Sequence, residues 1–173
     1  CQIKAIRKMQ AMQIMPSESI VFCLGLFCSG NFVLGERHRE KLAEIGGFSW
    51  DEVRKINIKD AFQIHLADGD IRTIPLDQLD FMKREACRFC PDYSAEYADL
   101  SFGGLGAAEG WTTVLARTPV GRAALSEAME SGLESASSKE GHSASRAFEQ
   151  VLDWSRRKKQ IAEENRGQLG KPS

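Results

Sequence analysis

A nearly unbroken apolar run at residues 19–28, SIVFCLGLFC, limits the fold more than any other feature of this sequence. Apolar runs of this length are typical of strands that are buried on both faces of a sheet. The segment before the run, residues 2–13, carries apolar side chains at intervals of three, which predicts an amphipathic helix. We therefore expect a helix followed by a buried strand that ends at Cys28.

The rest of the chain alternates between helical and strand-like patterns. The expected helical elements are residues 34–45, closed by a Gly-Gly pair, a turn at 49–52, a short helix at 75–83, a helix at 119–131 and a long helix from about 148. The expected strands form a hairpin or meander over residues 55–74 and flank a glycine-rich loop at 103–110. We predict an α/β fold in which a mixed β-sheet is flanked by helices.

Two segments near the carboxyl end are expected to be loosely held. Residues 135–145 are polar and rich in serine, which favours a loose connection, and residues 161–173 are expected to fray. The basic run at residues 156–159 is interpreted as a solvated helix face. With 173 residues, the chain has the length of one domain, so residues 1–173 are predicted to fold as a single domain.

Charge and hydropathy exclude several classes of partner. The chain has 23 Lys and Arg residues against 24 Asp and Glu residues, a net charge of −1, so there is no basic field to hold nucleic acid or an anionic membrane. No apolar run approaches the roughly 18 residues that a membrane span needs. There is no recognisable targeting segment and no initiator Met, so we expect a cytoplasmic piece of a longer protein without membrane insertion.

Five cysteines carry the strongest chemical signal. They are too few for a disulfide-stapled scaffold of this length, and Cys87 and Cys90 form a C-x-x-C pair whose thiolates could grip one metal or cluster. Cys28, at the end of the apolar run, and Cys1, at the start of the first helix, could join them. Cys23 lies inside the apolar run and is expected to be a core residue.

Four thiolates suit either a zinc ion or a [4Fe-4S] cluster. Structural zinc more often uses two local pairs, whereas here one pair is local and two ligands are scattered, which favours the cluster. A structural zinc module that serves binding or assembly is the alternative, and cysteines that bind nothing are the third reading. A thioredoxin-type redox motif is disfavoured because Pro91 follows the pair where that motif would open a helix.

The glycine-rich loop does not have the spacing of a Rossmann fingerprint followed by a helix. Its bare backbone would admit a phosphate or flavin, and a plain flexible turn explains the spacing equally well. Three histidines, His38, His65 and His142, are read as a surface, a strand and a loop residue, and their placement forms no catalytic or metal-type pair.

Four ordered stretches carry a resemblance to a known family. They are CQIKAIR at residues 1–7, GLFC at 25–28, CRFCPD at 87–92 with ADLSFG at 98–103, and GWTTV at 110–114 with RTPVG at 117–121. From residue 1 to about residue 160, the chain resembles the C-terminal catalytic part of the coenzyme F420 hydrogenase/dehydrogenase beta-subunit family. In that family a further N-terminal portion precedes the first of these stretches.

The resemblance implies a [4Fe-4S] cluster, FAD and electron transfer between reduced coenzyme F420, a deazaflavin, or a related donor and a partner subunit of hydrogenase, dehydrogenase or ferredoxin type. It places the cluster on Cys1, Cys28, Cys87 and Cys90 and leaves Cys23 in the core. For the flavin, we expect nearby groups from Gly103, Gly104, Gly106, Thr112 and Thr113. Hydride transfer needs no general acid or base, and no catalytic side chain is predicted.

Overall fold

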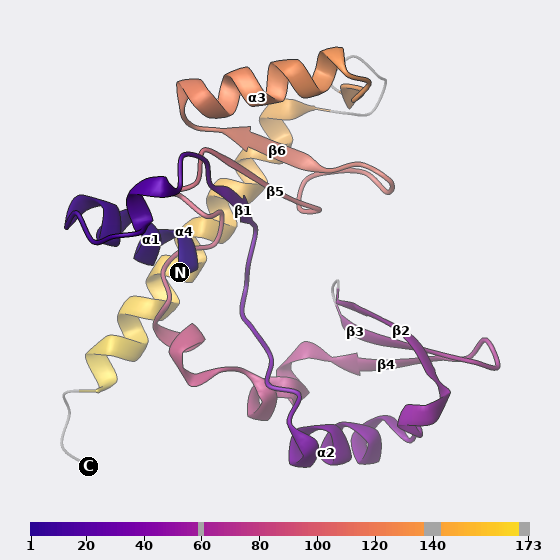
Figure 1. Ribbon diagram of the computed structural model, residues 1–173. Coiled ribbons are helices and arrows are strands. Elements are labelled where there is room, and N and C mark those ends of the chain that lie inside the picture. Colours follow the sequence, from indigo (N-terminus) through magenta and orange to yellow (C-terminus); the bar gives the residue numbers. More distant parts are fainter. Residues whose placement is uncertain (59–60, 137–142, 170–173) are drawn as a thin grey trace. The chain divides into compact units, whose positions relative to one another are not determined.

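The computed structural model describes residues 1–58, 61–136 and 143–169, which form two compact units (Figure 1). Unit 1 comprises Cys1–Ser29 and Arg88–Ser173, and unit 2 comprises Gly30–Cys87. Unit 2 is therefore an insertion between two parts of unit 1 along the chain. The single folding domain expected over residues 1–173 stays a prediction.

Unit 1 contains a three-stranded sheet in the order β1-β5-β6, with β1 parallel to β5 and β5 antiparallel to β6. Its strands are β1 (Leu24–Leu26), β5 (Leu100–Gly103) and β6 (Thr113–Ala116). Its helices are α1 (Gln2–Ala11), η1 (Ser17–Ser19), α3 (Pro119–Glu130) and α4 (Ala144–Gln168), and η4 (Glu85–Phe89) crosses from unit 2. The predicted mixture of helices and strands is confirmed, but the strands form two small sheets, one in each unit.

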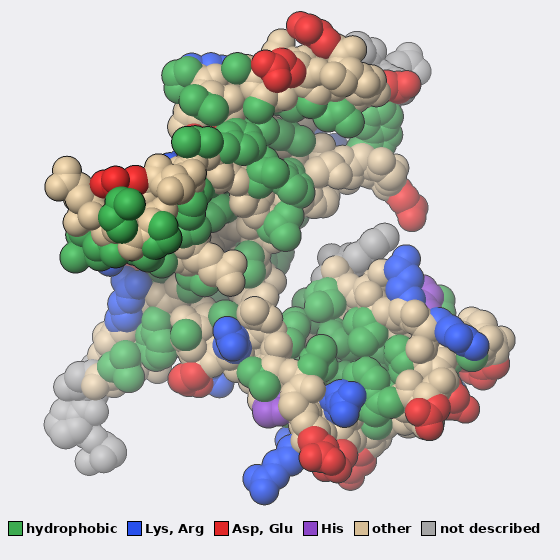
Figure 2. Space-filling model, in the orientation of Figure 1, with side chains coloured by type: hydrophobic (Ala, Val, Ile, Leu, Met, Phe, Trp, Pro, Cys, Tyr) green, Lys and Arg blue, Asp and Glu red, His purple; other side chains and the backbone are tan. Residues whose placement is uncertain are grey.

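The strand β1 is much shorter than the apolar run predicts. Leu24 and Leu26 are 55% and 64% exposed, and Val21, before the strand, is 82% exposed. On the opposite face, Gly25 packs against Ala95. Within the described part of the chain β1 pairs with β5 alone, so it is an edge strand and the prediction of burial on both faces is wrong. Exposed apolar side chains also gather around the end of α1 and η1 (Figure 2).

Helix α4 also differs from the expectation. It continues to Gln168, so residues 161–168, expected to fray, are helical, and Ala162 within them is 1% exposed. Burial of this face explains why the helix persists. The helix is capped by Ser143, whose hydroxyl accepts from the Arg146 amide at 3.3 Å. Residues 137–142, which include His142 and part of the loose connection expected at 135–145, lie outside the described residues. Residues 170–173 of the tail also lie outside them.

Unit 2 matches the sequence-based prediction closely. It contains α2 (Glu36–Gly46), η2 (Trp50–Glu52), β2 (Val53–Ile58), β3 (Ala61–Leu66), β4 (Ile71–Pro75) and η3 (Leu76–Met82). The three strands form an antiparallel meander in the order β2-β3-β4. Gly47 ends α2 at φ 60° and ψ 48°, the left-handed conformation that glycine adopts without strain. Ser49 and Glu52 form a capping box at η2.

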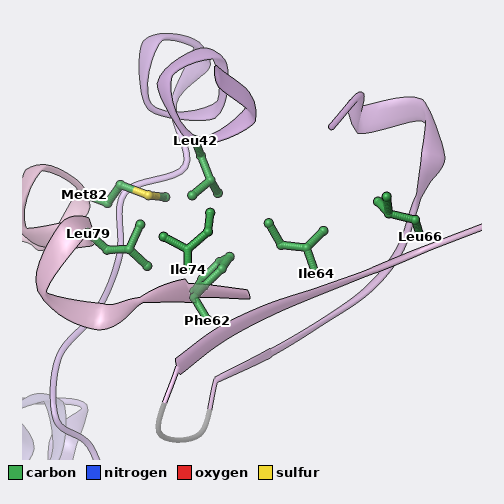
Figure 3. Packing of buried hydrophobic residues seen from close by; sticks show 7 residues of the cluster. All are labelled: Leu42, Phe62, Ile64, Leu66, Ile74, Leu79 and Met82. Carbon is green, nitrogen blue, oxygen red and sulfur yellow. The ribbon is translucent and has the colours of Figure 1, made fainter. Parts of the chain in front are cut away.

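The core of unit 2 follows from the period-two pattern of β3. Phe62, Ile64 and Leu66 are buried on one face of the meander, while the residues between them are half-buried. Figure 3 shows these side chains pointing toward residues from α2, β4 and η3, and the remaining members of the cluster are Leu42, Ile74, Leu79 and Met82. All seven side chains come from unit 2, so this unit has a hydrophobic core of its own.

Candidate functional site

Three of the four predicted ligand cysteines lie around one dipeptide of unit 1, Asp92-Tyr93. The Cys28 amide donates to the Tyr93 carbonyl at 2.8 Å, and the Cys90 sulfur lies 3.8 Å from the Asp92 carbonyl. The backbone nitrogen of Cys1 lies 3.9 Å from the Asp92 carboxylate. The start of α1, the end of β1 and the C-x-x-C segment therefore meet at this dipeptide.

The fourth cysteine, Cys87, is the last residue of unit 2 and lies on η4. Its sulfur accepts a hydrogen bond from the Asn31 amide at 3.3 Å, and its own amide donates to the Arg84 carbonyl at 2.9 Å. Along the chain it precedes Cys90 by three residues. The predicted gathering of all four sulfurs stays a prediction.

By their chemistry, free cysteine thiols are suited to bind a metal or an iron-sulfur cluster. None of the five cysteines is in a disulfide, Cys1 and Cys28 are exposed, and Cys87 and Cys90 are half-buried. In residues 1–58, 61–136 and 143–169, no three or more His, Cys, Asp or Glu side chains lie close enough together to hold a metal ion. Cys23 is 5% exposed, which confirms that it is a core residue.

A buried polar network fixes the dipeptide and the residue after it. The Asp92 carboxylate, 7% exposed, accepts from the Glu96 amide at 3.0 Å. Arg117 donates to the Ser94 carbonyl at 3.1 Å, to the Ser94 hydroxyl at 3.0 Å and also to the Ser101 hydroxyl. Burial lowers the pKa of Arg117, and the charges of Asp92 and Glu96 oppose that shift, so the guanidinium stays protonated. Arg117 thereby links β5 and β6 to the cysteine segment.

Asp99 is linked to three distant segments of unit 1 through three hydrogen bonds. It accepts from the guanidinium of Arg7, the hydroxyl of Thr118 and the amide of Cys23, each at 2.8 Å. Burial raises the pKa of Asp99, but the hydrogen bonds from Cys23 and Thr118 and the charge of Arg7 lower it by more, so the pKa of Asp99 is lowered. The carboxylate holds α1 and the start of α3 against the sheet.

Tyr93 lies in the middle of an aromatic row. Its ring centroid is 5.8 Å from that of Phe27 and 5.8 Å from that of Trp154, which belongs to α4. Burial raises the pKa of Tyr93, and the charge of Cys28 raises it further, so the phenol keeps its proton. The row packs the end of β1 and the helix α4 on either side of the dipeptide.

Helix α4 supplies residues of the site that the sequence analysis missed. Lys158 donates to the Cys28 carbonyl, Asn165 to the Arg88 carbonyl at 2.8 Å and Arg166 to the Phe89 carbonyl at 2.7 Å. Lys159 forms an ion pair with Glu96 at 2.8 Å. The basic run is therefore not simply a solvated face. No local pattern could have indicated the three hydrogen bonds, because their partners are 77 or more residues away along the chain.

The predicted flavin residues lie at the loop between β5 and β6, and packing explains two of the glycines. A Cβ at Gly103 would lie 2.5 Å from the Phe27 ring, and one at Gly106, where φ is +81°, would lie 2.7 Å from the Ala147 backbone. A Cβ at Gly104 would meet no atom within 4 Å. Thr112 is exposed, and Thr113 pairs with Gly103 across the strands. Gly104 is thus the glycine whose presence packing does not require.

A family model and several relatives match this chain over most of its length. The family model for the C terminus of the coenzyme F420 hydrogenase/dehydrogenase beta subunit matches residues 1–141. The coenzyme F420 hydrogenase subunit beta of Methanococcus voltae is 33% identical over 136 residues, covering 77% of this chain and 48% of that protein. The coenzyme F420-dependent sulfite reductase of Methanocaldococcus jannaschii is 27% identical over 135 residues, covering 70% of this chain and 21% of that protein.

A similar fold is found in the F420-reducing [NiFe] hydrogenase complex from Methanosarcina barkeri. One chain of that solved structure superposes with a TM-score of 0.78 at 28% identity, covering 98% of this chain and 60% of the other. The chain spans about half the length of the hydrogenase beta subunits that it matches. None of the helices in its described part has the length and hydropathy of a membrane-spanning segment.

Proposed function

Because the chain belongs to the coenzyme F420 hydrogenase/dehydrogenase beta-subunit family, we propose that it is the carboxy-terminal part of an iron-sulfur flavoprotein oxidoreductase. In this proposal it passes electrons between coenzyme F420, or a similar deazaflavin, and a partner redox subunit. The partner is a hydrogenase, dehydrogenase or ferredoxin-type subunit, in keeping with the hydrogenase complex that contains the similar chain. The proposal includes a cytoplasmic location, where thiols stay reduced.

The observation that carries the proposal is that Cys1, Cys28 and Cys90 each contact Asp92-Tyr93, Cys1 and Cys28 through their backbone nitrogens and Cys90 through its sulfur. Thiolates are the ligands of [4Fe-4S] clusters, and none of these cysteines is consumed by a disulfide. We propose Cys87 as the fourth ligand, because it forms a C-x-x-C pair with Cys90. Hydrogen bonds to the carbonyls of Cys28, Arg88 and Phe89 would hold these ligand segments in place.

The flavin is proposed to lie at the loop between β5 and β6. Its neighbours there would be Gly103, Gly104, Gly106, Thr112 and Thr113, with the exposed Gly104 and Thr112 open to contact. A flavin supplies two-electron hydride chemistry and an iron-sulfur cluster supplies one-electron transfer, so a protein that holds both connects a hydride donor to a one-electron acceptor. The chain's own part in this is to bind and orient both groups.

The metal content of the anaerobically purified chain tests this proposal against its alternatives. We expect a broad brown absorption and about four irons per chain, the stoichiometry of one four-cysteine cubane. One zinc per chain without colour would replace the proposal with the structural zinc module, since four thiolates also suit zinc. A folded, colourless protein with neither metal would support the third reading, in which the cysteines bind no metal or cluster.

A further inference from the structure

One face of α4 donates hydrogen bonds to backbone carbonyls of the two cysteine segments. Lys158 holds the Cys28 carbonyl, while Asn165 and Arg166 hold the carbonyls of the two residues before Cys90. Asn165 and Arg166 follow Lys158 by seven and eight positions, which is two turns, so all three share one side of the helix. Ser155 and Ala162, on the same side, are buried, which fixes this face against the rest of unit 1.

We propose that this face of α4 is a clasp that fixes the Cys28 segment relative to the Cys90 segment, and that Lys158 also places positive charge beside Cys28. The charge part of this inference rests on the proposed cluster, and the clasp part does not. The family model matches residues 1–141, so α4, which begins at Ala144, lies outside the matched segment.

The path of the chain gives the physical reason for a clasp. Cys28 and Cys90 are 62 residues apart, and nearly all of the chain between them forms unit 2, with a core of its own. This core therefore stabilises the elements of unit 2. Holding two distant segments in one geometry costs conformational entropy, which bonds from a third, rigid element offset. The Cys28 amide joins the two segments directly at the Tyr93 carbonyl, and α4 adds three hydrogen bonds to them.

The charge of Lys158 has a separate consequence. Its ammonium contacts the Cys28 backbone, whereas the neighbouring Lys159 is ion-paired with Glu96. A cluster gains negative charge when it is reduced, so a nearby cation stabilises the reduced form and raises the midpoint potential. Lys158 is thus a positioning residue whose loss would alter both the local backbone stability and the potential.

Hydrogen exchange on the metal-free chain tests the clasp directly. With Lys158→Gln we expect the amides of residues 26–30 to exchange roughly fivefold faster, and with Asn165→Ala those of residues 88–91. Arg157→Gln is the matched control for Lys158, because it removes an exposed positive charge from the next position of the helix. Equal exchange of residues 26–30 in Lys158→Gln and Arg157→Gln would overturn the clasp.

The midpoint potential of the iron-loaded chain tests the charge. We expect Lys158→Gln to lower the potential by more than Arg157→Gln does, at the same iron content. Equal shifts in the two variants would overturn this role of Lys158. A wild-type chain that takes up no iron would refute the proposed function and, with it, the charge effect, while hydrogen exchange would still decide the clasp.

Discussion

At the scale of single residues, Asp99 is expected to contribute strongly to stability. It is 5% exposed and accepts three hydrogen bonds, including that from the Arg7 guanidinium. Asp99→Ala leaves the Cys23 amide and the Arg7 charge without this acceptor, so we expect the free energy of unfolding to fall by about 3 kcal/mol. Urea denaturation at neutral pH measures this loss.

An exposed ion pair supplies the control for Asp99. Asp153 and Arg156 pair at 3.5 Å with both side chains more than two-thirds exposed, so Asp153→Ala should change the free energy of unfolding by less than about 1 kcal/mol. Equal losses in the two variants would contradict the assignment of Asp99 as the buried junction of unit 1.

The same carboxylate makes part of the stability depend on pH. The pKa of Asp99 is lowered in the folded state, so its contribution is present above the unfolded pKa of about 3.9 and is lost as the pH falls through the folded pKa. The stability difference between wild type and Asp99→Ala should therefore be constant near neutral pH and shrink below about pH 4. A difference that grows on acidification would reverse the sign of the shift.

Substitutions at the adjacent Gly103 and Gly104 allow the effect on side-chain packing to be measured separately from the effect on flavin binding. Gly103→Ala brings a Cβ to 2.5 Å from the Phe27 ring and should destabilise the fold, whereas Gly104→Ala meets no atom within 4 Å. We expect Gly104→Ala to change the free energy of unfolding by no more than about 1 kcal/mol. If the flavin approaches this loop, Gly104→Ala weakens FAD binding in a titration, and an unchanged affinity would contradict that placement.

Single residues also show what a sequence can reveal about this site. Cys23 could be assigned to the core because it lies inside an apolar run, and its exposed fraction confirms that assignment. Asp99 and Lys158 could not be identified in this way, because their partners lie far away along the chain and no local spacing encodes them. Local patterns predict which side chains are apolar or reactive, and long-range contacts decide which polar side chains are held.

At the scale of elements, the end of α4 makes a sharp prediction. Ala162 is 1% exposed and the neighbouring Ile161 is 55% exposed. Ala162→Asp forces a charge into a buried contact, so we expect a loss of roughly 2 kcal/mol or more in the free energy of unfolding. Ile161→Asp introduces the same side chain at an exposed position and should cost roughly 0.5 kcal/mol.

Thermal or urea denaturation compares the two α4 variants. Similar stabilities for both would show that the last turns of α4 do not pack as described, and that residues 161–168 fray as the sequence pattern suggests. A selective loss in Ala162→Asp would establish that this face of the helix is held against unit 1.

Elements differ in how well the sequence predicts them. The meander of unit 2 was predictable, because apolar and polar residues alternate over residues 62–66, and α2 because a Gly-Gly pair marks its end. The strand β1 was not, because an apolar run does not reveal that its strand lies at a sheet edge with one face open. The sequence pattern reports hydrophobicity, whereas neighbours in space decide which of those side chains become buried.

At the scale of the whole molecule, the separate core of unit 2 predicts separate stability. Leu79 is fully buried in that core, and Leu79→Ala should cost about 2–5 kcal/mol within unit 2. Hydrogen exchange should therefore accelerate over residues 30–87 while the amides of β5 stay protected. A uniform acceleration over both units would show instead that residues 1–173 unfold as the single domain that the sequence predicts.

Iron binding by the cysteine variants tests the central claim most directly. After anaerobic reconstitution, the wild-type chain should hold about four irons. The iron content should fall well below this in each of the proposed ligand variants, namely Cys1→Ala, Cys28→Ala, Cys87→Ala and Cys90→Ala. Cys23→Ala, which alters the buried cysteine, should retain the wild-type content. Full iron content in any of the four ligand variants would contradict the proposed site.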